Sequence, residues 1–255
     1  MSTNATLLSA TGVNVSFGGL KALSNVSIDL APKEVVGLIG PNGAGKTTLF
    51  NAITGIVKPD SGKLTLNGLE HSWPATHQLA ELGIARTLQG VGLFPELTVL
   101  ENVMIGAQKF AKKGLLAASI GLDTSDERAL ADRALYALEK VYAGGLADRR
   151  AGTLAYPDTK RVAIARAIVS EPKILMLDEP AGGLGPQDIE WMNDFIRNIH
   201  AQMSVIIVEH HMDVVMSVCD RLYVLNFGEV IASGNSEDVR RNPAVIEAYL
   251  GAEKK

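Results

Sequence analysis

The sequence predicts an α/β fold interrupted by a helical insert, and three observations support this prediction. Residues Val35–Ile39 are continuously apolar, as in a strand buried on both faces, and they run directly into a glycine-rich loop. Strand-like apolar runs return at Ile174–Leu177 and Val205–Val208. Between about Asn102 and Val141 the apolar residues follow helical spacing instead. A helical segment therefore interrupts an α/β core.

The segment before the glycine-rich loop predicts two half-buried strands. Apolar and polar residues alternate there with a period of two, and the apolar positions are Val13, Val15 and Phe17, then Val26, Ile28 and Leu30. After the loop, Thr48–Thr54 predicts a helix that ends at Gly55. The stretch Ala80–Leu88 is also helix-like.

The insert predicts two helices. Thr124 and Glu127 have the spacing of a capping box, and the apolar residues after them share one helical face: Leu130, Ala134, Leu138 and Val141. Gly144-Gly145 ends this helix, and a second helix is expected over about Thr159–Val169. Near the end of the chain, residues 221–225 and 229–232 predict two strands joined by a turn, followed by a helix over about Ser236–Tyr249.

Composition and charge exclude several classes of protein. The 255 residues suffice for one large domain or two small ones, and 47% hydrophobic with 20% charged residues is typical of folded proteins. The longest apolar runs fall short of the ~20 residues that a membrane-spanning helix needs, and no signal peptide is expected at Met1–Thr6. The single cysteine, Cys219, rules out an internal disulfide and is expected to be buried. A formal net charge of -4 argues against a nucleic-acid partner.

A phosphate-binding loop is the strongest functional motif. Residues 40–47 fit the pattern of a glycine, four arbitrary residues and then Gly-Lys-Thr. The glycines let the backbone curl, so that successive N–H groups and the start of a helix point at phosphates. Lys46 is expected to reach the β- and γ-phosphates of ATP, and the Thr47 hydroxyl to hold Mg²⁺. The alternative is a glycine-rich turn that only caps a helix. The predicted ATP-binding residues of this loop are Gly40, Pro41, Asn42, Gly43, Ala44, Gly45, Lys46, Thr47 and Thr48.

Carboxylates follow a buried strand, as a site for magnesium and a nucleotide requires. Asp178 is expected to act on Mg²⁺ through its water ligands, and Glu179 to orient and polarise the attacking water. The alternative is a polar strand end with a helix cap. His210 follows another strand, where a histidine can sense the γ-phosphate, although a lone histidine there is more often a surface residue. Gln89 lies in a loop with Gly90 and Gly92.

Together, these residues and the segment Leu154–Arg166 resemble, in order and spacing, the ATP-binding cassette of ABC transporters. The resemblance covers nearly the whole chain. It implies a P-loop NTPase fold: a RecA-like core at residues 1–89 and 167–255, an N-terminal antiparallel β subdomain, and a helical subdomain at residues 90–166. It also implies that ATP and Mg²⁺ are bound.

The same resemblance implies roles for individual residues. Phe17 matches the aromatic residue that stacks on adenine, Gln89 the glutamine that binds Mg²⁺ and couples the subunits, and His210 the switch histidine. Glu179, His210 and Gln89 are then the catalytic residues. For Phe17, a place in the core of the first hairpin remains an equal alternative.

Three stretches are similar, more narrowly, to the cassette that serves branched-chain amino acid importers: residues 83–89, residues 93–103, and the ending 246–251. The resemblance implies a second cassette, identical or different, and two membrane permeases as partners, with a periplasmic substrate-binding protein acting indirectly. It places the chain peripherally at the cytoplasmic face of the membrane. Urea, short amides and lipopolysaccharide are alternative cargoes.

The signature segment departs from the family pattern Leu-Ser-Gly-Gly-Gln, which also occurs with tyrosine at the third place. In this chain it reads Leu154, Ala155, Tyr156, Pro157 and Asp158. Ala155 lacks a hydroxyl, Pro157 lacks an N–H, and Asp158 brings a negative charge toward a γ-phosphate. The resemblance implies that this segment acts on the ATP of a partner cassette, so the departures predict two unequal ATP sites. Gly185, where asparagine or aspartate is usual, points the same way.

Two other readings remain open. A regulatory cassette with little hydrolysis fits the altered signature, but Glu179 argues for an enzyme. A cassette of chromosome maintenance, DNA repair or translation usually has coiled-coil insertions, tandem cassettes or basic surfaces, and the sequence has none of these.

Overall fold

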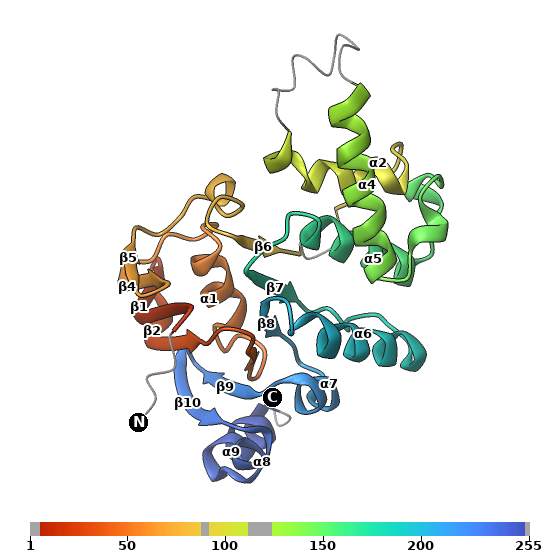
Figure 1. Cartoon of the computed structure of the whole chain (residues 1–255). Helices are drawn as coiled ribbons and strands as arrows, with labels where there is room; N and C mark the ends of the chain where they lie inside the picture. Colours follow the sequence, from red (N-terminus) through yellow and green to blue (C-terminus); the bar gives the residue numbers. More distant parts are fainter. Residues whose placement is uncertain (1–5, 88–91, 112–123, 253–255) are drawn as a thin grey trace.

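A mostly parallel sheet forms the centre of the structure. The computed structural model describes residues 6–87, 92–111 and 124–252 (Figure 1). The strands of this sheet lie in the order β10-β9-β3-β8-β7-β6, and only β9 and β10 pair in the antiparallel sense. The strands β3, β7 and β8 are buried along their whole length, which explains their continuously apolar sequences. The bounds are β3 (Val35–Ile39), β6 (Ile84–Arg86), β7 (Ile174–Asp178), β8 (Ser204–Val208), β9 (Arg221–Asn226) and β10 (Glu229–Gly234).

A second, antiparallel sheet has the order β2-β1-β4-β5. Its strands are β1 (Leu8–Phe17), β2 (Leu20–Leu30), β4 (Ser61–Leu66) and β5 (Leu69–His71). The two strands predicted from alternation, β1 and β2, are confirmed. The sequence did not predict β4 and β5, because β4 has only two buried positions, Leu64 and Leu66. Pairing with β1 places this segment in the sheet.

Helices cover both faces of the parallel sheet. Helix α1 (Lys46–Ile53) contributes Leu49 and Phe50 to an apolar cluster that also contains residues of both sheets. On the opposite face, α6 (Pro186–Ile199) packs Phe195 and Ile196 against β7 and β8. Helix α7 (Met212–Val218) packs against β9. Cys219 packs in the same cluster; it is half-buried rather than fully buried, and burial raises the pKa of its thiol.

The predicted helical insert is confirmed as a group of packed helices at the upper right of Figure 1, which shares an apolar cluster with β7 and β8. The helices are α2 (Val99–Gly106), α4 (Thr124–Lys140) and α5 (Tyr156–Ile168). Thr98 and Glu101 form a capping box at the start of α2. The capping box predicted at Thr124 involves a side chain outside the described residues. Short 3₁₀ turns lie at Thr76–Gln78, Gln108–Phe110, Gly144–Leu146 and Ala151–Thr153.

Besides the bounds of the helix after the glycine-rich loop, three predicted helices need correction. The stretch Ala80–Leu88 is not a helix where it is described: Gly83 adopts φ +73°, and Ile84–Arg86 form β6, in register with β7. Pairing with a distant strand overrides the local helical pattern there. Helix α5 begins three residues earlier than predicted, because Pro157 is tolerated in a first turn.

The third correction concerns the end of the chain, where two helices replace one: α8 (Ser236–Arg241) and α9 (Pro243–Ala252). Asn242 between them is extended, with φ -71° and ψ 121°, because a residue before proline disfavours the helical conformation. Among the described residues, no helix has the length and apolar content needed to cross a bilayer.

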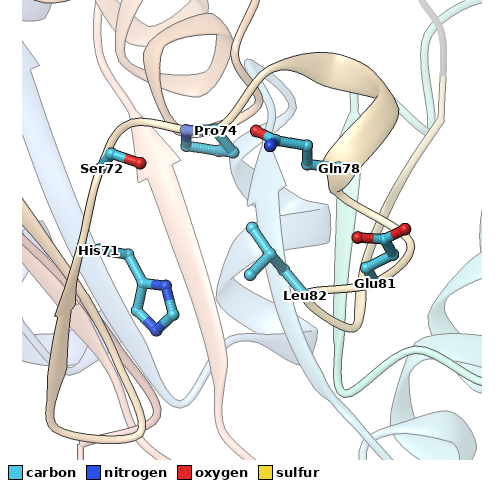
Figure 2. A pocket seen from close by; sticks show the side chains of 6 residues that line it. All are labelled: His71, Ser72, Pro74, Gln78, Glu81 and Leu82. Carbon is cyan, nitrogen blue, oxygen red and sulfur yellow. The ribbon is translucent and has the colours of Figure 1, made fainter.

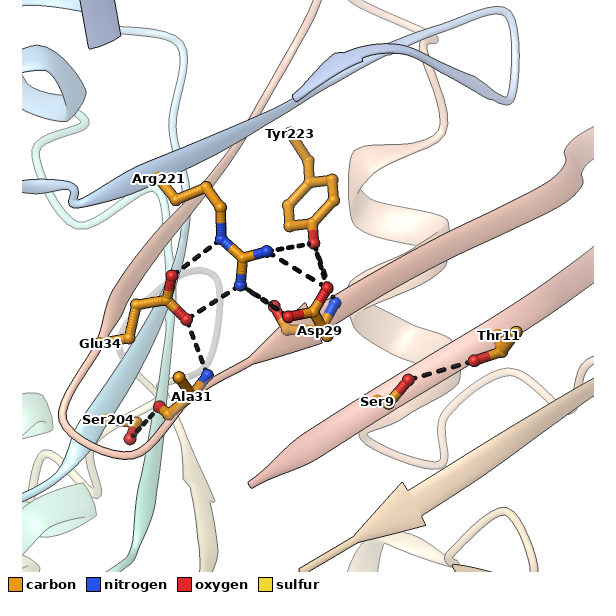
Figure 3. A network of polar contacts seen from close by, with 8 residues as sticks. All are labelled: Ser9, Thr11, Asp29, Ala31, Glu34, Ser204, Arg221 and Tyr223. Atoms are coloured by element: carbon orange, nitrogen blue, oxygen red, sulfur yellow. Dashed lines mark hydrogen bonds and ion pairs between the residues drawn. The ribbon is translucent and has the colours of Figure 1, made fainter. Parts of the chain in front are cut away.

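A charged network joins the two sheets at the end away from the glycine-rich loop (Figure 3). The Arg221 guanidinium of β9 donates to both carboxylate oxygens of Asp29, in β2, and to both of Glu34, just before β3. It also donates to the Tyr223 hydroxyl at 2.9 Å. Ser204, at the start of β8, donates to the Ala31 carbonyl in the β2–β3 connection. The network therefore fixes the start of β3, the strand that leads to the site.

Candidate nucleotide-binding site

The phosphate-binding loop connects β3 to α1, and its glycines are required by geometry. Gly40 has φ +146°, and a Cβ there would lie 2.1 Å from the Leu225 carbonyl oxygen. Gly45 has φ +103° and is the N-cap of α1, with no side-chain cap hydrogen bond. Helix α1 begins at Lys46 rather than at the predicted Thr48, so Lys46, Thr47 and Thr48 form its first turn. The N-terminal N–H groups and helix dipole of α1 are thus directed toward an anion at the loop.

Lys46 is held over this loop by backbone carbonyls. Its Nζ donates to the carbonyl oxygens of Gly40 at 2.7 Å and Pro41 at 2.9 Å. Burial lowers the pKa of Lys46, and the negative charge of Glu179 opposes this effect. The ammonium group is therefore positioned for phosphate oxygens that approach the loop.

Asp178, at the end of β7, has the surroundings of a cation ligand. Its carboxylate is buried, and Oδ1 has no hydrogen-bond partner. Burial raises the pKa of Asp178, and the Arg86 guanidinium, 3.7 Å from Oδ2, opposes this rise. A buried carboxylate oxygen without a partner fits Mg²⁺, which prefers oxygen ligands. Thr47, in the first turn of α1, carries the hydroxyl that is predicted to hold Mg²⁺.

Glu179 and His210 come together beside this carboxylate. The Oε1 atom of Glu179 lies 4.0 Å from Nδ1 of His210, and both side chains are partly exposed. The backbone N–H of Glu179 donates to the Val208 carbonyl at the end of β8. The carboxyl ends of β7 and β8 thus bring together two residues that lie far apart in the sequence, at the edge where α/β sheets bind ligands.

Glu209 was missed by the sequence analysis, although it directly follows a buried strand. Its side chain is fully buried, and Oε1 accepts from the backbone N–H of Ala181 at 2.8 Å. Oε2 accepts from the N–H groups of His210 and His211 and lies 3.0 Å from His211 Nδ1. Potential metal-ligand atoms of Glu209, His210 and His211 lie within 4.8 Å of one another. The backbone donors already occupy the carboxylate, so Glu209 fixes the loops that carry Glu179 and His210.

Arg86 is a second residue that the analysis missed as part of the site. From β6 it donates to Asn51 Oδ1 at 3.1 Å and to Thr54 Oγ1 at 2.7 Å, both in or beside α1. The guanidinium also lies over the Phe50 ring, 4.8 Å from its centre. Arg86 therefore ties the helix of the phosphate loop to Asp178, and only the placement of β6 reveals this.

Two of the predicted residues have different outcomes. Phe17 ends β1 with 52% of its surface exposed, so it is not a core residue of the first hairpin. This exposure leaves its ring accessible for stacking. Gln89 lies outside the described residues. Thr87, two positions before it, accepts a hydrogen bond from the Asp178 N–H through Oγ1.

The signature segment forms the start of α5. Ala155 is the N-cap and makes no side-chain cap hydrogen bond, and Pro157 and Asp158 lie in the first turn. Asp158 lies 3.9 Å from Arg161, which also pairs with Asp188 of α6 at 3.1 Å. Its negative charge is therefore partly balanced within the chain. Half-buried Leu154 packs against the apolar cluster that the helices of the insert share with α6, β7 and β8.

A separate hollow of about 140 Å³ lies away from this site, between β5 and the 3₁₀ turn at Thr76–Gln78 (Figure 2). It is lined by His71, Ser72, Pro74, Gln78, Glu81 and Leu82. Its volume is below the roughly 300 Å³ at which small-molecule pockets begin. The hollow is therefore too small to be a second candidate site for a nucleotide.

A phosphate loop after a buried parallel strand, carboxylates at the ends of two neighbouring strands, and a helical insert define a P-loop ATPase. The model of the ABC transporter family matches residues 23–182, and a model described as branched-chain amino acid ATP-binding cassette transporter matches residues 229–255. The chain belongs to the ABC transporter family, as an ATP-binding cassette with ATPase activity.

Relatives and solved structures agree with this assignment. The chain is 43% identical over 250 residues to the high-affinity branched-chain amino acid transport ATP-binding protein LivG of Escherichia coli, covering 96% of this chain and 98% of the relative. The ADP conformation of MJ1267, an ATP-binding cassette of an ABC transporter, superposes with a TM-score of 0.84 at 33% identity, covering 96% and 99% of the two chains. A dimeric post-hydrolysis state of the cassette MJ0796, bound to ADP and Pi, has a TM-score of 0.76 at 25% identity, covering 90% and 98%.

Proposed function

We propose that this chain hydrolyses ATP to drive a membrane importer of branched-chain amino acids. The observation that carries the proposal is the meeting of Lys46, Asp178, Glu179 and His210 at one edge of the parallel sheet. The names of its relatives and the match over residues 229–255 support the choice of cargo. The cargo is selected by other subunits and does not touch this chain.

In the proposed site, each residue has one role. The loop N–H groups and Lys46 bind the phosphates, and Phe17 stacks on adenine. Thr47 and Gln89 would hold Mg²⁺, and Asp178 would act on the ion through its water ligands; when bound, the ion supplies positive charge to the phosphate oxygens. Glu179 orients and polarises the attacking water, and His210, 4.0 Å from it, senses the γ-phosphate. Glu209 holds the His210 backbone in place.

Glu179→Gln tests this mechanism because it removes the negative charge and keeps the shape. We expect ATP to bind normally while turnover falls by about a hundredfold or more. Full turnover in this variant rejects the proposed role of Glu179. Loss of nucleotide binding instead indicates a folding defect, and the melting temperature distinguishes the two cases.

We also propose that the chain works in a dimer with unequal ATP sites. A second cassette completes the site at Lys46 with its own signature, while residues 154–158 of this chain serve the partner's nucleotide poorly. Pro157 has no N–H to donate, and a charge-assisted hydrogen bond contributes roughly 1.5–3 kcal/mol. The dimeric cassette MJ0796 supports pairing as such.

ATPase assays of the chain alone and with its cognate second cassette test the asymmetry. We expect low activity alone, and full activity alone rejects the idea. The triple variant Ala155→Ser, Pro157→Gly, Asp158→Gln is expected to raise turnover at the site that this segment serves. No change in turnover counts against the proposed cause.

The partners and location follow from the same proposal. Two membrane permeases hold the cassettes at the cytoplasmic face of the membrane, and a periplasmic substrate-binding protein delivers the cargo. Residues 90–166 act as the helical subdomain, and residues 1–89 and 167–255 as the catalytic core. Co-purification of tagged chain with permease subunits tests the assembly, and recovery with nucleic acid instead contradicts it.

A further inference from the structure

The start of α5 contacts the loop that carries this chain's own Glu179. Lys160 donates from Nζ to two backbone carbonyl oxygens, that of Glu179 at 2.8 Å and that of Pro180 at 3.2 Å. Tyr156, one turn earlier, donates from its hydroxyl to the Gly182 carbonyl at 3.3 Å. Because residues four apart lie on one helical face, both side chains reach the same loop. The contact lies within one chain, although the segment itself is proposed to act on a partner.

The Glu179 backbone needs such support. Glu179 has φ +46°, a left-handed conformation that is uncommon for residues other than glycine. Such a conformation is strained and persists only where the surroundings impose it. The backbone N–H donates to Val208, and the carbonyl accepts from both Gly182 N–H and Lys160 Nζ. Lys160 therefore adds a side-chain hydrogen bond to the backbone bonds that hold Glu179.

Close packing strengthens the link between α5 and the loop. A Cβ at Gly183 would lie 2.8 Å from the Tyr156 ring, and Gly183 has φ +75°. The Lys160 ammonium lies 5.5 Å from the centre of the same ring. Tyr156, Lys160 and the loop Glu179–Gly183 thus form one packed unit.

We propose that Lys160 is a positioning residue for the catalytic glutamate, and that Tyr156 and Lys160 couple α5 to the loop Glu179–Gly183. Contact of α5 with the nucleotide of a partner then sets the orientation of Glu179 at this chain's own ATP. The proposal rests on the catalytic role of Glu179 given above. It adds a connection within one chain between the two ATP sites of the dimer.

Lys160→Met tests the proposal, because it keeps an unbranched side chain of nearly the same length and removes the donors. We expect kcat to fall by about tenfold, since a small misplacement of a catalytic group is costly, while the dissociation constant of a fluorescent ATP analogue changes less than about threefold. Lys160→Arg keeps the charge and the donors, and is expected to recover part of the activity. Lys173→Met, at an exposed lysine just before β7, is the matched control and is expected to behave as wild type.

A double-mutant cycle separates positioning from a purely structural role. If Lys160 acts through Glu179, adding Lys160→Met to Glu179→Gln leaves the residual turnover almost unchanged. If the two losses multiply, or if kcat of Lys160→Met stays within twofold of wild type, the proposal is rejected. Failure of the proposed function is distinct, because then wild type is inactive or Glu179→Gln keeps full turnover.

Tyr156→Phe tests the same coupling with a milder change, in case Lys160→Met destabilises the fold. It removes only the hydroxyl that donates to Gly182, and a loss of about twofold to threefold in kcat with unchanged nucleotide affinity is expected. If Lys160→Met melts well below Lys173→Met, this milder variant decides: unchanged kcat in Tyr156→Phe then overturns the coupling.

Discussion

Replacing Arg221 with methionine tests the network that anchors β3. The guanidinium donates to Asp29 and Glu34 through both carboxylate oxygens of each, and to the Tyr223 hydroxyl. Methionine keeps most of the side-chain volume but leaves two neighbouring carboxylates without their shared cation. The variant therefore isolates the charged hydrogen bonds from the packing of β9.

The size of the effect follows from the exposure of the groups. Breaking a fully buried ion pair costs roughly 3–5 kcal/mol, whereas exposed pairs contribute roughly 0–1 kcal/mol. The Arg221 side chain is 28% exposed, and those of Asp29 and Glu34 are 45% and 14% exposed. We therefore expect a loss of about 2–3 kcal/mol in the free energy of unfolding. For a chain of this length, that loss lowers the melting temperature by roughly 4–12 °C.

Urea titrations of both proteins between pH 3 and pH 8 check the prediction and its sign. The hydrogen bond from Arg221 holds the pKa of Asp29 below its ordinary value of 3.8. The stabilisation is therefore complete above that value and is lost as the pH falls through the lowered pKa. The difference between variant and wild type is expected to be constant above about pH 5 and to shrink below about pH 4.

Arg241→Met is the control, because Arg241 pairs with Glu237 on the exposed surface of α8. A change below about 0.5 kcal/mol is expected there. Equal effects at Arg221 and Arg241, or a difference that does not depend on pH, refute the reasoning.

Two further predictions concern the site. Gly40→Ala places a Cβ against the β9 backbone and is expected to weaken ATP binding at least about tenfold. The control is Gly19→Ala, where a Cβ meets no heavy atom within 4 Å and ATP binding is expected to stay unchanged. Titration of each variant with nucleotide measures the difference. Arg86→Met leaves Asp178 buried without its cation, and thermal unfolding is expected to show a loss of about 2–4 kcal/mol in the free energy of unfolding. Arg197→Met, at an exposed ion pair, is expected to lose less than about 1 kcal/mol. Equal losses in the two variants refute the role of Arg86.

The local motifs were readable from the sequence because each depends on neighbouring residues. The phosphate loop needs glycines at fixed positions and a lysine directly after them. The continuously apolar residues Val35–Ile39 predict the buried strand that precedes the loop. The apolar strand before Asp178 and Glu179 is equally local. Helix α4 was likewise predictable, because its apolar residues recur with helical spacing along one face.

Elements that depend on contacts between distant segments were predicted wrongly from the sequence or were not predicted. The three residues of β6 carry a helix-like pattern, and only β7, about 90 positions later, makes them a strand. Strand β4 has too few apolar positions to stand out without β1 beside it. Helix α9 separates from α8 for a local reason that was overlooked, the effect of Pro243 on Asn242.

The sequence by itself determined that this chain carries a phosphate loop, a carboxylate pair and a helical insert, since these follow from residue type and spacing. The tertiary structure decided which side chains support them. It placed Arg86 between α1 and Asp178, buried Glu209 beneath His210, and brought Lys160 to the Glu179 backbone. Such contacts join strand ends and helices that are far apart in the chain, and a polar residue has no periodic pattern that reveals its distant partner.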